Sequence, residues 1–378
     1  MGFHCVGIDS NWEALGLNLS DTRIVTELNE LEIVYREIDK LNMKVAGVLS
    51  YCSEVGVLAA AKIRQFYKLG YPNASEVSIF LDKSLQRKAL DEAGIINPRW
   101  KLISEFNETL ELEDNFDFPL IVKPSDSSGS RGVSEVNSME ELKMQLGQAR
   151  KFSRSQKVLI EEFIDGTEYT VEVAAKEKKI EVLLVTRKIK VSNSIRTVAS
   201  ELWSVDPKEE IFAVLSKLAV RVFQIFGLVE GVGHLEAILK QNGDVFVIEA
   251  AIRGGGFNLA NQMVMVTTGF DYCFWSIASE ARIKSHEKMT YYKPSVLFFH
   301  PSKLGVITKI SGISEANTVE GVHVEQLIGV GEQVINATTD ADRIYSAVIV
   351  SDNIGNLKTK KIQVQNMIQV EILQQYAN

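Results

Sequence analysis

Residues 234–249 constrain the fold more than any other part of the chain. They read His234-Leu-Glu-Ala-Ile-Leu-Lys-Gln-Asn-Gly-Asp-Val-Phe-Val-Ile-Glu249, with Asn-Gly between two β-prone runs. This pattern is the strongest short-range signal for a β-hairpin with a two-residue type I′ turn. If Asn242 and Gly243 form that turn, counting outward along both strands places Glu236 directly opposite Glu249.

The predicted register puts two carboxylates on one face of the hairpin and apolar side chains on the other. Like charges directly opposite each other destabilise a sheet, so we expect a cation to compensate Glu236 and Glu249. Mg²⁺ is commonly bound by one or two carboxylates together with the phosphates of a nucleotide. The alternative is a surface pair that Lys240, Arg253 or solvent neutralises. The predicted core face carries Leu235, Ala237, Leu239, Phe246, Ile248 and Ala250.

A second feature is a Gly/Ser-rich stretch that follows an apolar strand ending in lysine. The strand ends at Lys123, and small residues fill most of positions 125–132. Small residues allow consecutive backbone N–H groups to converge on an anion, and Lys123 would add a positive charge. Neither a Walker P-loop nor a Gly-x-Gly-x-x-Gly motif is present. The stretch predicts a phosphate cradle, with a plain hairpin or flexible turn as the alternative.

A third feature is an acidic turn between two apolar runs. Glu161 and Glu162 end the first run, Gly166 marks the turn, and Glu168 begins the second run. A strand that ends against a linker can offer backbone N–H and C=O groups to the flat edge of a purine. A solvated acidic turn is the alternative.

Composition excludes several classes of protein. With 41 basic and 49 acidic side chains the net charge is −8, which gives no general attraction for nucleic acid or anionic lipid. No segment reaches the roughly 18 apolar residues that a membrane span requires. The three cysteines, Cys5, Cys52 and Cys273, are far apart and form no Cys-x-x-Cys pair. This pattern predicts that the cysteines are small buried hydrophobic residues of a protein in a reducing compartment. It also predicts a cytoplasmic location.

The 378 residues are enough for two or three domains at roughly 100 to 200 residues each. The first 80 residues alternate strands and helices, which predicts a parallel sheet of βαβ units. This part begins at what reads as a second strand, so we expect the usual first strand and glycine-rich turn to be absent. Here strands are expected at 3–8 and 45–49, and helices at 30–41 and 55–67.

An α+β pattern follows, and short β-like runs dominate after about residue 290. The expected helices are 81–93, 139–146 and 208–226. The expected strands are 120–123, 158–162, 169–174, 180–186, 234–240, 245–250, 296–299, 322–327 and 347–350.

Taken in chain order, these features resemble the ATP-grasp superfamily, which includes biotin carboxylase, the D-alanine:D-alanine ligases and the bacterial L-amino acid ligases. The resemblance rests on Asp82-Lys83 at a helix start, the Lys123 loop, the acidic turn, and the hairpin running into residues 250–258, Ala-Ala-Ile-Arg-Gly-Gly-Gly-Phe-Asn. It covers residues 77–285 well and the flanking parts more loosely.

The resemblance implies a fold of mixed class, α/β and α+β. It predicts a Rossmann-like N-terminal domain at 1–80, abbreviated at its start, and an ATP-grasp domain at 81–290 with a lid subdomain at about 100–187. A small β-rich closing domain would occupy 291–378.

The resemblance also implies a role for each matching position. Lys123 and Arg253 would be catalytic, and Glu236 and Glu249 would hold Mg²⁺. Many relatives carry a metal-binding Asn where this chain has Ala251, and Asn258 could substitute for it. The residues expected to contact ATP are Lys83, Lys123, Ser125, Ser128, Gly129, Gly132, Glu161, Phe163, Ile164 and Glu168.

A further set of residues is expected to meet the substrate. Arg253 would sit beside the reacting carboxylate, and the run of glycines at 254–256 would admit substrate close to the backbone. His234 is a lone histidine, which is more often structural. Arg187 lies in a basic strand segment with Lys188, Lys190 and Arg196, and such a segment is more often a solvated face. The expected substrate residues are Arg253, Gly255, His234 and Arg187.

The function that the resemblance implies is an ATP-dependent, ADP-forming ligase. It would activate a small carboxylate as an acyl phosphate and join it to an amine, with ATP and Mg²⁺, or Mn²⁺ as an alternative ion. Its partners would be small-molecule carboxylates and amines, and a second copy of the chain is a further partner to test. The alternative is a catalytically silent ATP-grasp module that binds or senses nucleotide, which Ala251 and the abbreviated N-terminus favour.

Overall fold

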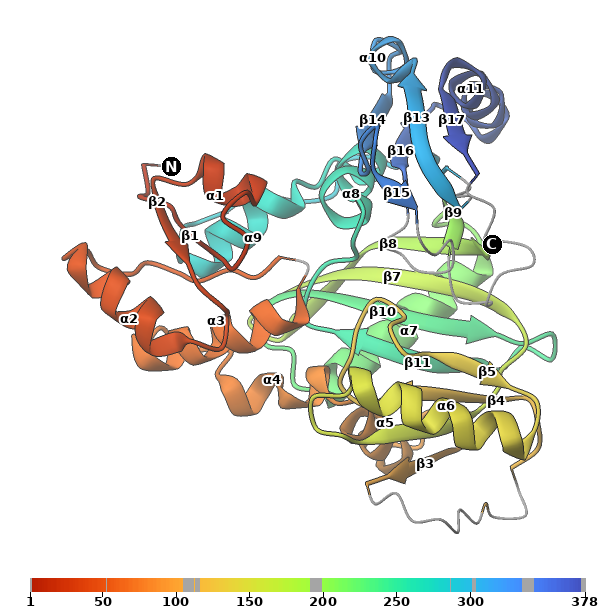
Figure 1. The fold of residues 1–378 in the computed structure, drawn as a ribbon, viewed down its shortest axis with the longest axis horizontal. Coiled ribbons are helices and arrows are strands. Elements are labelled where there is room, and N and C mark those ends of the chain that lie inside the picture. Colours follow the sequence, from red (N-terminus) through yellow and green to blue (C-terminus); the bar gives the residue numbers. More distant parts are fainter. Residues whose placement is uncertain are drawn as a thin grey trace.

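The computed structural model describes residues 2–51, 53–104, 112, 116–190, 199–285, 287–300, 304–334 and 343–374. Figure 1 shows the N-terminal elements on the left, two larger sheets in the centre, and the C-terminal elements above them. None of the described helices is long and apolar enough to span a membrane.

The N-terminal part is built on a small parallel sheet, as predicted. Strands β1 (Val6–Asp9) and β2 (Thr22–Val25) pair in parallel, with helix α1 (Leu15–Leu19) between them. Helices α2 (Leu31–Lys40) and α3 (Glu54–Phe66) follow.

The strand predicted at residues 45–49 is wrong, because no strand is assigned there and β2 supplies the second strand instead. Val45 and Val48 still pack against the apolar cluster of this part. Their hydrophobicity therefore reflects burial without strand pairing.

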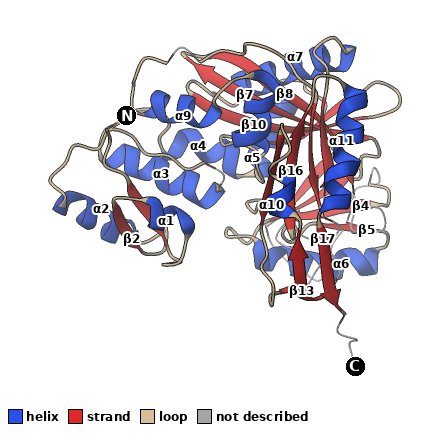
Figure 2. Cartoon of the chain, turned by 90° about the horizontal axis from the view of Figure 1, so that it is seen from above, coloured by secondary structure: helices blue, strands red, loops and turns tan. Residues whose placement is uncertain are grey.

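Two helices connect this part to the rest of the molecule. Helix α4 (Ala74–Leu81) begins with a capping box at Asn73. In α5 (Lys83–Glu92) the side chain of Asp82 accepts the Ser84 N–H as N-cap, which fixes Lys83 as the first helical residue. Figure 2 shows α3 and α4 between the N-terminal sheet and the larger sheets.

A four-stranded antiparallel sheet carries the Lys123 loop. The order is β3-β6-β4-β5, and helix α6 (Met139–Phe152) packs its apolar side on the sheet. Lys123 lies near the end of β4, and the Gly/Ser stretch connects β4 to β5. The strands are β3 (Trp100–Ile103), β4 (Leu120–Pro124), β5 (Ser134–Val136) and β6 (Val158–Glu162).

An eight-stranded antiparallel sheet forms the centre, in the order β11-β10-β7-β8-β9-β12-β16-β14. Helix α7 (Glu210–Ile225) packs on it and contributes Leu215, Ala219, Val222 and Phe223 to the main core. The strands are β7 (Thr167–Lys176), β8 (Lys179–Lys190), β9 (Ala199–Ser204), β10 (Gly231–Leu239), β11 (Val245–Ala251), β12 (Ser295–Phe299), β14 (Val322–Gln326) and β16 (Tyr345–Val350).

The remaining elements follow β11 in the chain. A third sheet has the order β15-β13-β17. The predicted boundaries at residues 80 and 290 stay predictions, and the central sheet takes strands from both sides of residue 290. The elements are η1 (Leu259–Met263), α8 (Val264–Thr268), α9 (Tyr272–Glu280), β13 (Gly305–Ser311), α10 (Ile313–Ala316), β15 (Gln333–Val334), α11 (Ile354–Met367) and β17 (Gln369–Leu373).

The β10–β11 hairpin has the predicted carboxylate register but a different turn. Lys240 O accepts the Gly243 N–H at 3.1 Å and Lys240 N donates to Asp244 O at 2.9 Å, so three residues close the loop. The predicted two-residue turn is therefore wrong. A bulge next to Glu236 inserts one extra residue in β11, and Glu236 again pairs with Glu249.

The bulge also changes which side chains of β11 reach the core. Val245 and Val247 pack in the main cluster, whereas Ile248 lines a cavity and Phe246 lies under the ammonium group of Lys240. The core face predicted for Phe246 and Ile248 is therefore wrong, because one inserted residue exchanges the two faces. The prediction is correct for Leu235, Ala237, Leu239 and Ala250.

The expectation of buried cysteines is wrong where it can be checked. Cys5 is exposed, and Cys273 is half-buried with its thiol donating to Tyr51 Oη at 3.2 Å. Both are free thiols. Cys52 lies outside the described residues.

Gly233 tests the packing of α7 on the central sheet. A Cβ at this position would lie 2.5 Å from the Phe223 ring, so Gly233→Ala should lower the free energy of unfolding by about 1–3 kcal/mol, measured by urea denaturation. The control is Gly147→Ala in α6, where a Cβ meets nothing within 4 Å. That variant should be neutral or stabilised, and equal effects of the two substitutions would contradict the packing described.

Candidate active site

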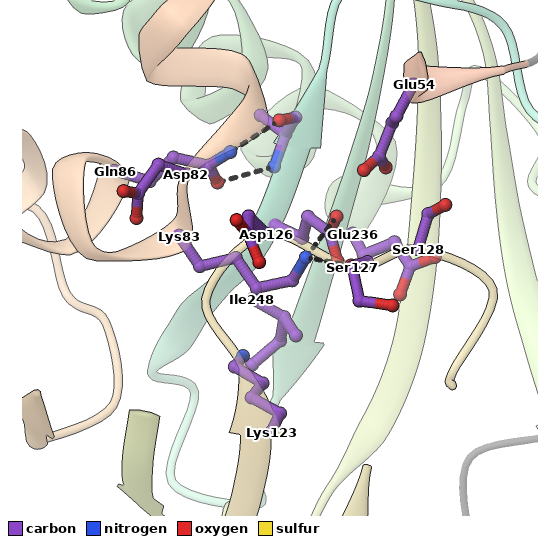
Figure 3. Close-up of polar contacts among 12 residues, drawn as sticks. Glu54, Asp82, Lys83, Gln86, Lys123, Asp126, Ser127, Ser128, Glu236 and Ile248 are labelled. Carbon is purple, nitrogen blue, oxygen red and sulfur yellow. Dashed lines mark hydrogen bonds and ion pairs between the residues drawn. The ribbon is translucent and has the colours of Figure 1, made fainter. Parts of the chain in front are cut away.

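A cavity of about 340 Å³ opens between the four-stranded sheet and the β10–β11 hairpin. Its walls come from the start of α5, the β4–β5 loop, the end of β6, strands β7, β8, β10 and β11, and the turn after β11. Segments far apart in the sequence therefore meet at one place. Figure 3 shows Lys83, Lys123 and Glu236 gathered there with Ser127 and Ser128 of the loop.

Both glutamates of the hairpin line this cavity, as their register predicts. Glu249 Oε1 lies 3.0 Å from Lys83 Nζ, and the same ammonium donates to Ser127 O at 2.7 Å. Burial acts to lower the pKa of Lys83, but the carboxylates of Glu249 and Glu54 outweigh it, and the pKa is raised. Lys83 therefore stays charged and ties the hairpin to the β4–β5 loop.

Glu236 is surrounded by positive charge. Burial acts to raise its pKa, but Lys188, His234 and Arg253 outweigh burial and hold the pKa well below its usual range. His234 Nε2 lies 3.4 Å from Glu236 Oε1, while His234 Nδ1 contacts Glu172. Burial opposes protonation of this imidazole, yet Glu172 raises its pKa to about 9. The histidine is thus a cation at neutral pH.

Lys123 belongs to a buried chain of charges at the cavity wall. Its Nζ lies 2.7 Å from Glu161 Oε2, and Arg87 Nε donates to Glu161 Oε1 at 2.8 Å. Burial lowers the pKa of Lys123, with Arg87 and Lys83 adding to the effect and Glu161 opposing it. Burial acts to raise the pKa of Glu161, but Arg87 and Lys123 outweigh it and the pKa is lowered.

Two lysines of β8 face the cavity and hold Glu168. Lys188 contacts one carboxylate oxygen of Glu168, and Lys190 Nζ lies 2.9 Å from the other. Arg187, expected at the substrate, faces away, with Nε donating to Tyr169 Oη at 3.2 Å. Strand alternation explains the error, because Lys188 pairs with Glu168 and Arg187 pairs with core-facing Tyr169. Arg196 lies outside the described residues.

Most of the residues expected to contact ATP line the cavity, and two do not. Ser125 is buried beneath the loop, and its carbonyl accepts the Lys83 N–H at 2.8 Å. A Cβ on Gly132 would lie 2.9 Å from the Phe152 ring, so packing explains this glycine. The residues that do line the cavity are Lys83, Lys123, Ser128, Gly129, Glu161, Phe163, Ile164 and Glu168.

The glycines after β11 are explained mainly by packing. A Cβ on Gly254 would lie 2.6 Å from Ala260 Cβ, and one on Gly255 would lie 2.5 Å from Leu259 Cδ2. Gly255 does not line the cavity, and its N–H donates to Glu172 at 3.1 Å. Only Gly256, which lines the cavity with open space around it, fits the expected approach of substrate to the backbone.

The structure does not bring Asn258 to the glutamate pair. Its amide donates to Glu325 and to Ser346 Oγ, and its oxygen accepts from Asn261 at 2.9 Å. Asn258 is absent from the cavity wall. The expectation that it substitutes for a metal-binding Asn is therefore wrong. Arg253 does line the cavity, held by Glu54 at 3.1 Å and by Gly254 O at 3.1 Å.

The donor set can be tested for a divalent ion. Among the described residues there is no group of three or more His, Cys, Asp or Glu side chains that could hold a metal. Glu236 and Glu249 offer carboxylate oxygens in a cavity that also contains lysines. Mg²⁺ accepts two carboxylates when phosphate oxygens and water complete its shell. The residues fit a nucleotide-bound Mg²⁺ and do not form a separate metal cage.

Residues 116–261 match the family model described as the ATP-grasp domain. The chain contains an ATP-grasp domain. The matched range covers the Lys123 loop, the acidic turn and the hairpin, so the predicted superfamily is confirmed.

Relatives and solved structures extend the likeness. A D-alanine–D-alanine ligase of Pseudomonas putida is 26% identical over 177 residues, 46% of this chain and 54% of that protein. The chain thus spans about half the length of such ligases. An L-arginine-specific L-amino acid ligase of Bacillus subtilis is 21% identical over 333 residues, 85% of this chain and 79% of that protein.

The ATP-grasp fold is also found in a solved L-amino acid ligase from Bacillus licheniformis. Its TM-score is 0.83 at 18% identity, and the alignment covers 98% of this chain and 93% of the other. At this identity the likeness establishes the fold. The predicted mixed α/β class with an ATP-grasp fold is confirmed.

Sequence reasoning missed several polar residues that support the ATP-grasp site. Gln86 exchanges two hydrogen bonds with the backbone of Ala250, at 2.8 and 3.0 Å. Arg87 and Glu172 are fully buried. Arginine and glutamate are rarely buried unless paired, so Arg87 in an amphipathic helix and Glu172 in an apolar strand were detectable as unusual. The residues with which Arg87 and Glu172 pair could not be identified from the sequence.

Glu161→Gln should lower the pKa of Lys123 further. The carboxylate of Glu161 is the main charge that opposes the effect of burial on Lys123, so its removal lets Lys123 lose its proton at lower pH. The measurement is ¹³C NMR titration of lysine Cε signals, with Lys123→Arg to assign the signal. The control is Glu162→Gln, since Glu162 pairs with Arg99 at 2.9 Å. An unchanged or raised pKa in Glu161→Gln would contradict the described network.

Proposed function

We propose that the protein is an ATP-dependent, ADP-forming ligase that joins a small carboxylate to an amine. The observation that carries this proposal is the convergence of two opposed carboxylates, Glu236 and Glu249, with Lys83 and Lys123 around one cavity. Oxygen ligands for Mg²⁺ and fixed cations for phosphate are what phosphoryl transfer requires of a protein.

The nucleotide would lie between the two sheets. Phe163 and Ile164, at the end of β6, would border adenine, and Glu168 would face the ribose. Lys83, Lys123 and the small residues of the β4–β5 loop would meet the phosphates. Lys188 and Lys190, now bound to Glu168, add positive charge on this side of the cavity.

Glu236 and Glu249 would hold Mg²⁺, which neutralises charge on the phosphates when bound. Arg253 would then lie beside the reacting carboxylate. Its guanidinium is fixed by Glu54 and by Gly254 O, so it can offset negative charge without reorganising during the reaction. The cationic His234 lines the same end of the cavity.

The proposed reaction has two steps, the formation of an acyl phosphate and its capture by an amine. An oxygen of the substrate carboxylate attacks the γ-phosphorus of ATP, the bond from phosphorus to the bridging oxygen breaks, and ADP leaves. A neutral amine then attacks the acyl carbon, the carbon–oxygen bond to phosphate breaks, and inorganic phosphate leaves with loss of one proton from nitrogen. Exclusion of water by the loop would protect the acyl phosphate from hydrolysis.

The substrate class rests on the relatives. An L-amino acid ligase aligns with 85% of the chain and another has the same fold over 98% of it. The likeness to these proteins favours amino acids as both the carboxylate substrate and the amine substrate of this chain. The specific pair of substrates is therefore best found by screening amino acids and small amines for phosphate release in the presence of Mg·ATP.

Glu249→Gln and Lys123→Ala should each lower the rate of ADP release by at least about 100-fold, because Glu249 would hold the Mg²⁺ that neutralises the phosphates and Lys123 would contact the phosphates directly. The measurement is a coupled ADP assay with the substrates found in the screen.

Arg187→Gln is the control for Lys188→Gln, because the two side chains lie on opposite faces of β8. Turnover should fall for Lys188→Gln and stay near wild type for Arg187→Gln.

Unchanged turnover in Glu249→Gln would refute the ligase assignment. Calorimetry with Mg·ATP separates the silent alternative, since a sensor binds nucleotide without releasing ADP. A chain that binds Mg·ATP but shows no turnover across the screen would support that alternative instead.

A further inference from the structure

Arg87 is a buried cation that contacts both sheets around the site, and it does not line the cavity. Its exposed fraction is 0%. Arg87 Nε donates to Glu161 Oε1 at 2.8 Å, Nη1 donates to Val247 O at 3.2 Å, and Nη2 donates to Ile248 O at 2.5 Å. One guanidinium thus joins helix α5 to both sheets that enclose the cavity.

The first connection fixes the bulge of β11. Ile248 is the residue inserted by that bulge, and Val247 pairs with Ala237 directly beside it. A bulge leaves the inserted residue without its ladder partner, and Arg87 supplies donors to the carbonyls of both residues. Without the bulge, the three-residue turn would put Glu236 and Glu249 out of register.

The second connection fixes Lys123. Glu161 uses one carboxylate oxygen for Arg87 and the other for Lys123 Nζ, at 2.8 and 2.7 Å. The carboxylate therefore stands in a set position, and the lysine ammonium is held at the end of β4. Without Arg87, Glu161 would keep only Lys123 as a charged partner, and its carboxylate would lose one of the two contacts that set its orientation.

Only arginine provides both connections. Its planar fork presents five N–H donors in fixed directions, whereas lysine has one compact ammonium. A lysine at position 87 could balance Glu161 but could not reach two successive carbonyls of β11 at the same time.

We propose that Arg87 is a positioning residue that sets the glutamate pair and Lys123 in register with each other. This inference rests on the proposed function, because it assigns the two connections to the metal-binding and phosphate-binding halves of one site. Arg87 touches no substrate and acts through Glu161 and the β11 backbone.

The test uses calorimetric affinity for ADP, measured once in EDTA and once with excess Mg²⁺. The ratio of the affinity with Mg²⁺ to the affinity in EDTA, called the metal ratio below, reports how much the metal strengthens ADP binding. Glu249→Gln should reduce that ratio, and Lys123→Ala should reduce the affinity for ADP in EDTA. These two variants calibrate the metal-binding and phosphate-binding halves separately.

Arg87→Lys should separate the two connections. The metal ratio should fall by about 10- to 100-fold, as is usual when a supporting partner of metal ligands is lost. Affinity for ADP in EDTA should stay close to wild type because Glu161 keeps a cationic partner. Arg87→Met, which loses both connections, should reduce the ratio and the affinity together.

Arg64→Met is the matched control for burial of an arginine. Arg64 is 6% exposed and pairs with Glu280, with Nε to Oε2 at 3.0 Å, and it does not line the cavity that holds Glu236 and Glu249. This variant should lower the melting temperature and leave both ADP affinities near wild type. A general loss of stability therefore cannot imitate the effect expected of Arg87→Lys.

The outcomes are distinguishable. If Arg87→Lys is folded and its metal ratio equals that of wild type while Glu249→Gln reduces it, the inference on Arg87 is overturned and the proposed function stands. If wild-type protein binds no ADP, the proposed function fails and this inference fails with it. Should Arg87→Met not fold, Arg87→Lys decides alone.

Discussion

Buried and half-buried charges dictate the arrangement of this site, because each needs a partner of opposite sign. Glu161 lies between Arg87 and Lys123, Glu249 meets Lys83, and Glu168 meets two lysines of β8. The desolvation of an ion costs several kcal/mol, and only well-placed partners offset it. Helix α5 and the two sheets are therefore held together by ion pairs that also face, or stand directly behind, the cavity.

Local patterns in the sequence were sufficient for much of this arrangement. The Asn-Gly signal predicted the hairpin, and Glu236 does pair with Glu249, but it does so because the bulge in β11 offsets the third residue of the turn. The Lys-ended strand followed by small residues placed Lys123 on the cavity wall. Such signals act over a few residues, so they are visible in one sequence. The motif order then identified the ATP-grasp domain.

The errors come from partners that lie far away in the chain. A bulge at Ile248 is stabilised by Arg87, which is 161 residues earlier, and nothing near β11 announces it. Asn258 was expected at a metal but bonds to Glu325 and Ser346 of the C-terminal strands. Gly254 and Gly255 were attributed to substrate, whereas the side chains of Tyr272 and Glu172, together with those of the following helical turn, occupy the space beside them. Register and packing across distant segments decide these cases.

The continuity of the central sheet limits how the molecule can move. Hydrogen-bonded pairs run without interruption from β11 through β7, β9 and β12 to β14, so the C-terminal strands and the glutamate-bearing hairpin belong to one ladder. A hinge through that ladder would break several backbone hydrogen bonds at once. A displacement of the separate four-stranded sheet, which carries Lys123 and the small-residue loop, would leave the backbone hydrogen bonds of the central sheet intact. In such a displacement the β10–β11 hairpin would stay fixed, and the four-stranded sheet that carries Lys123 would move relative to it.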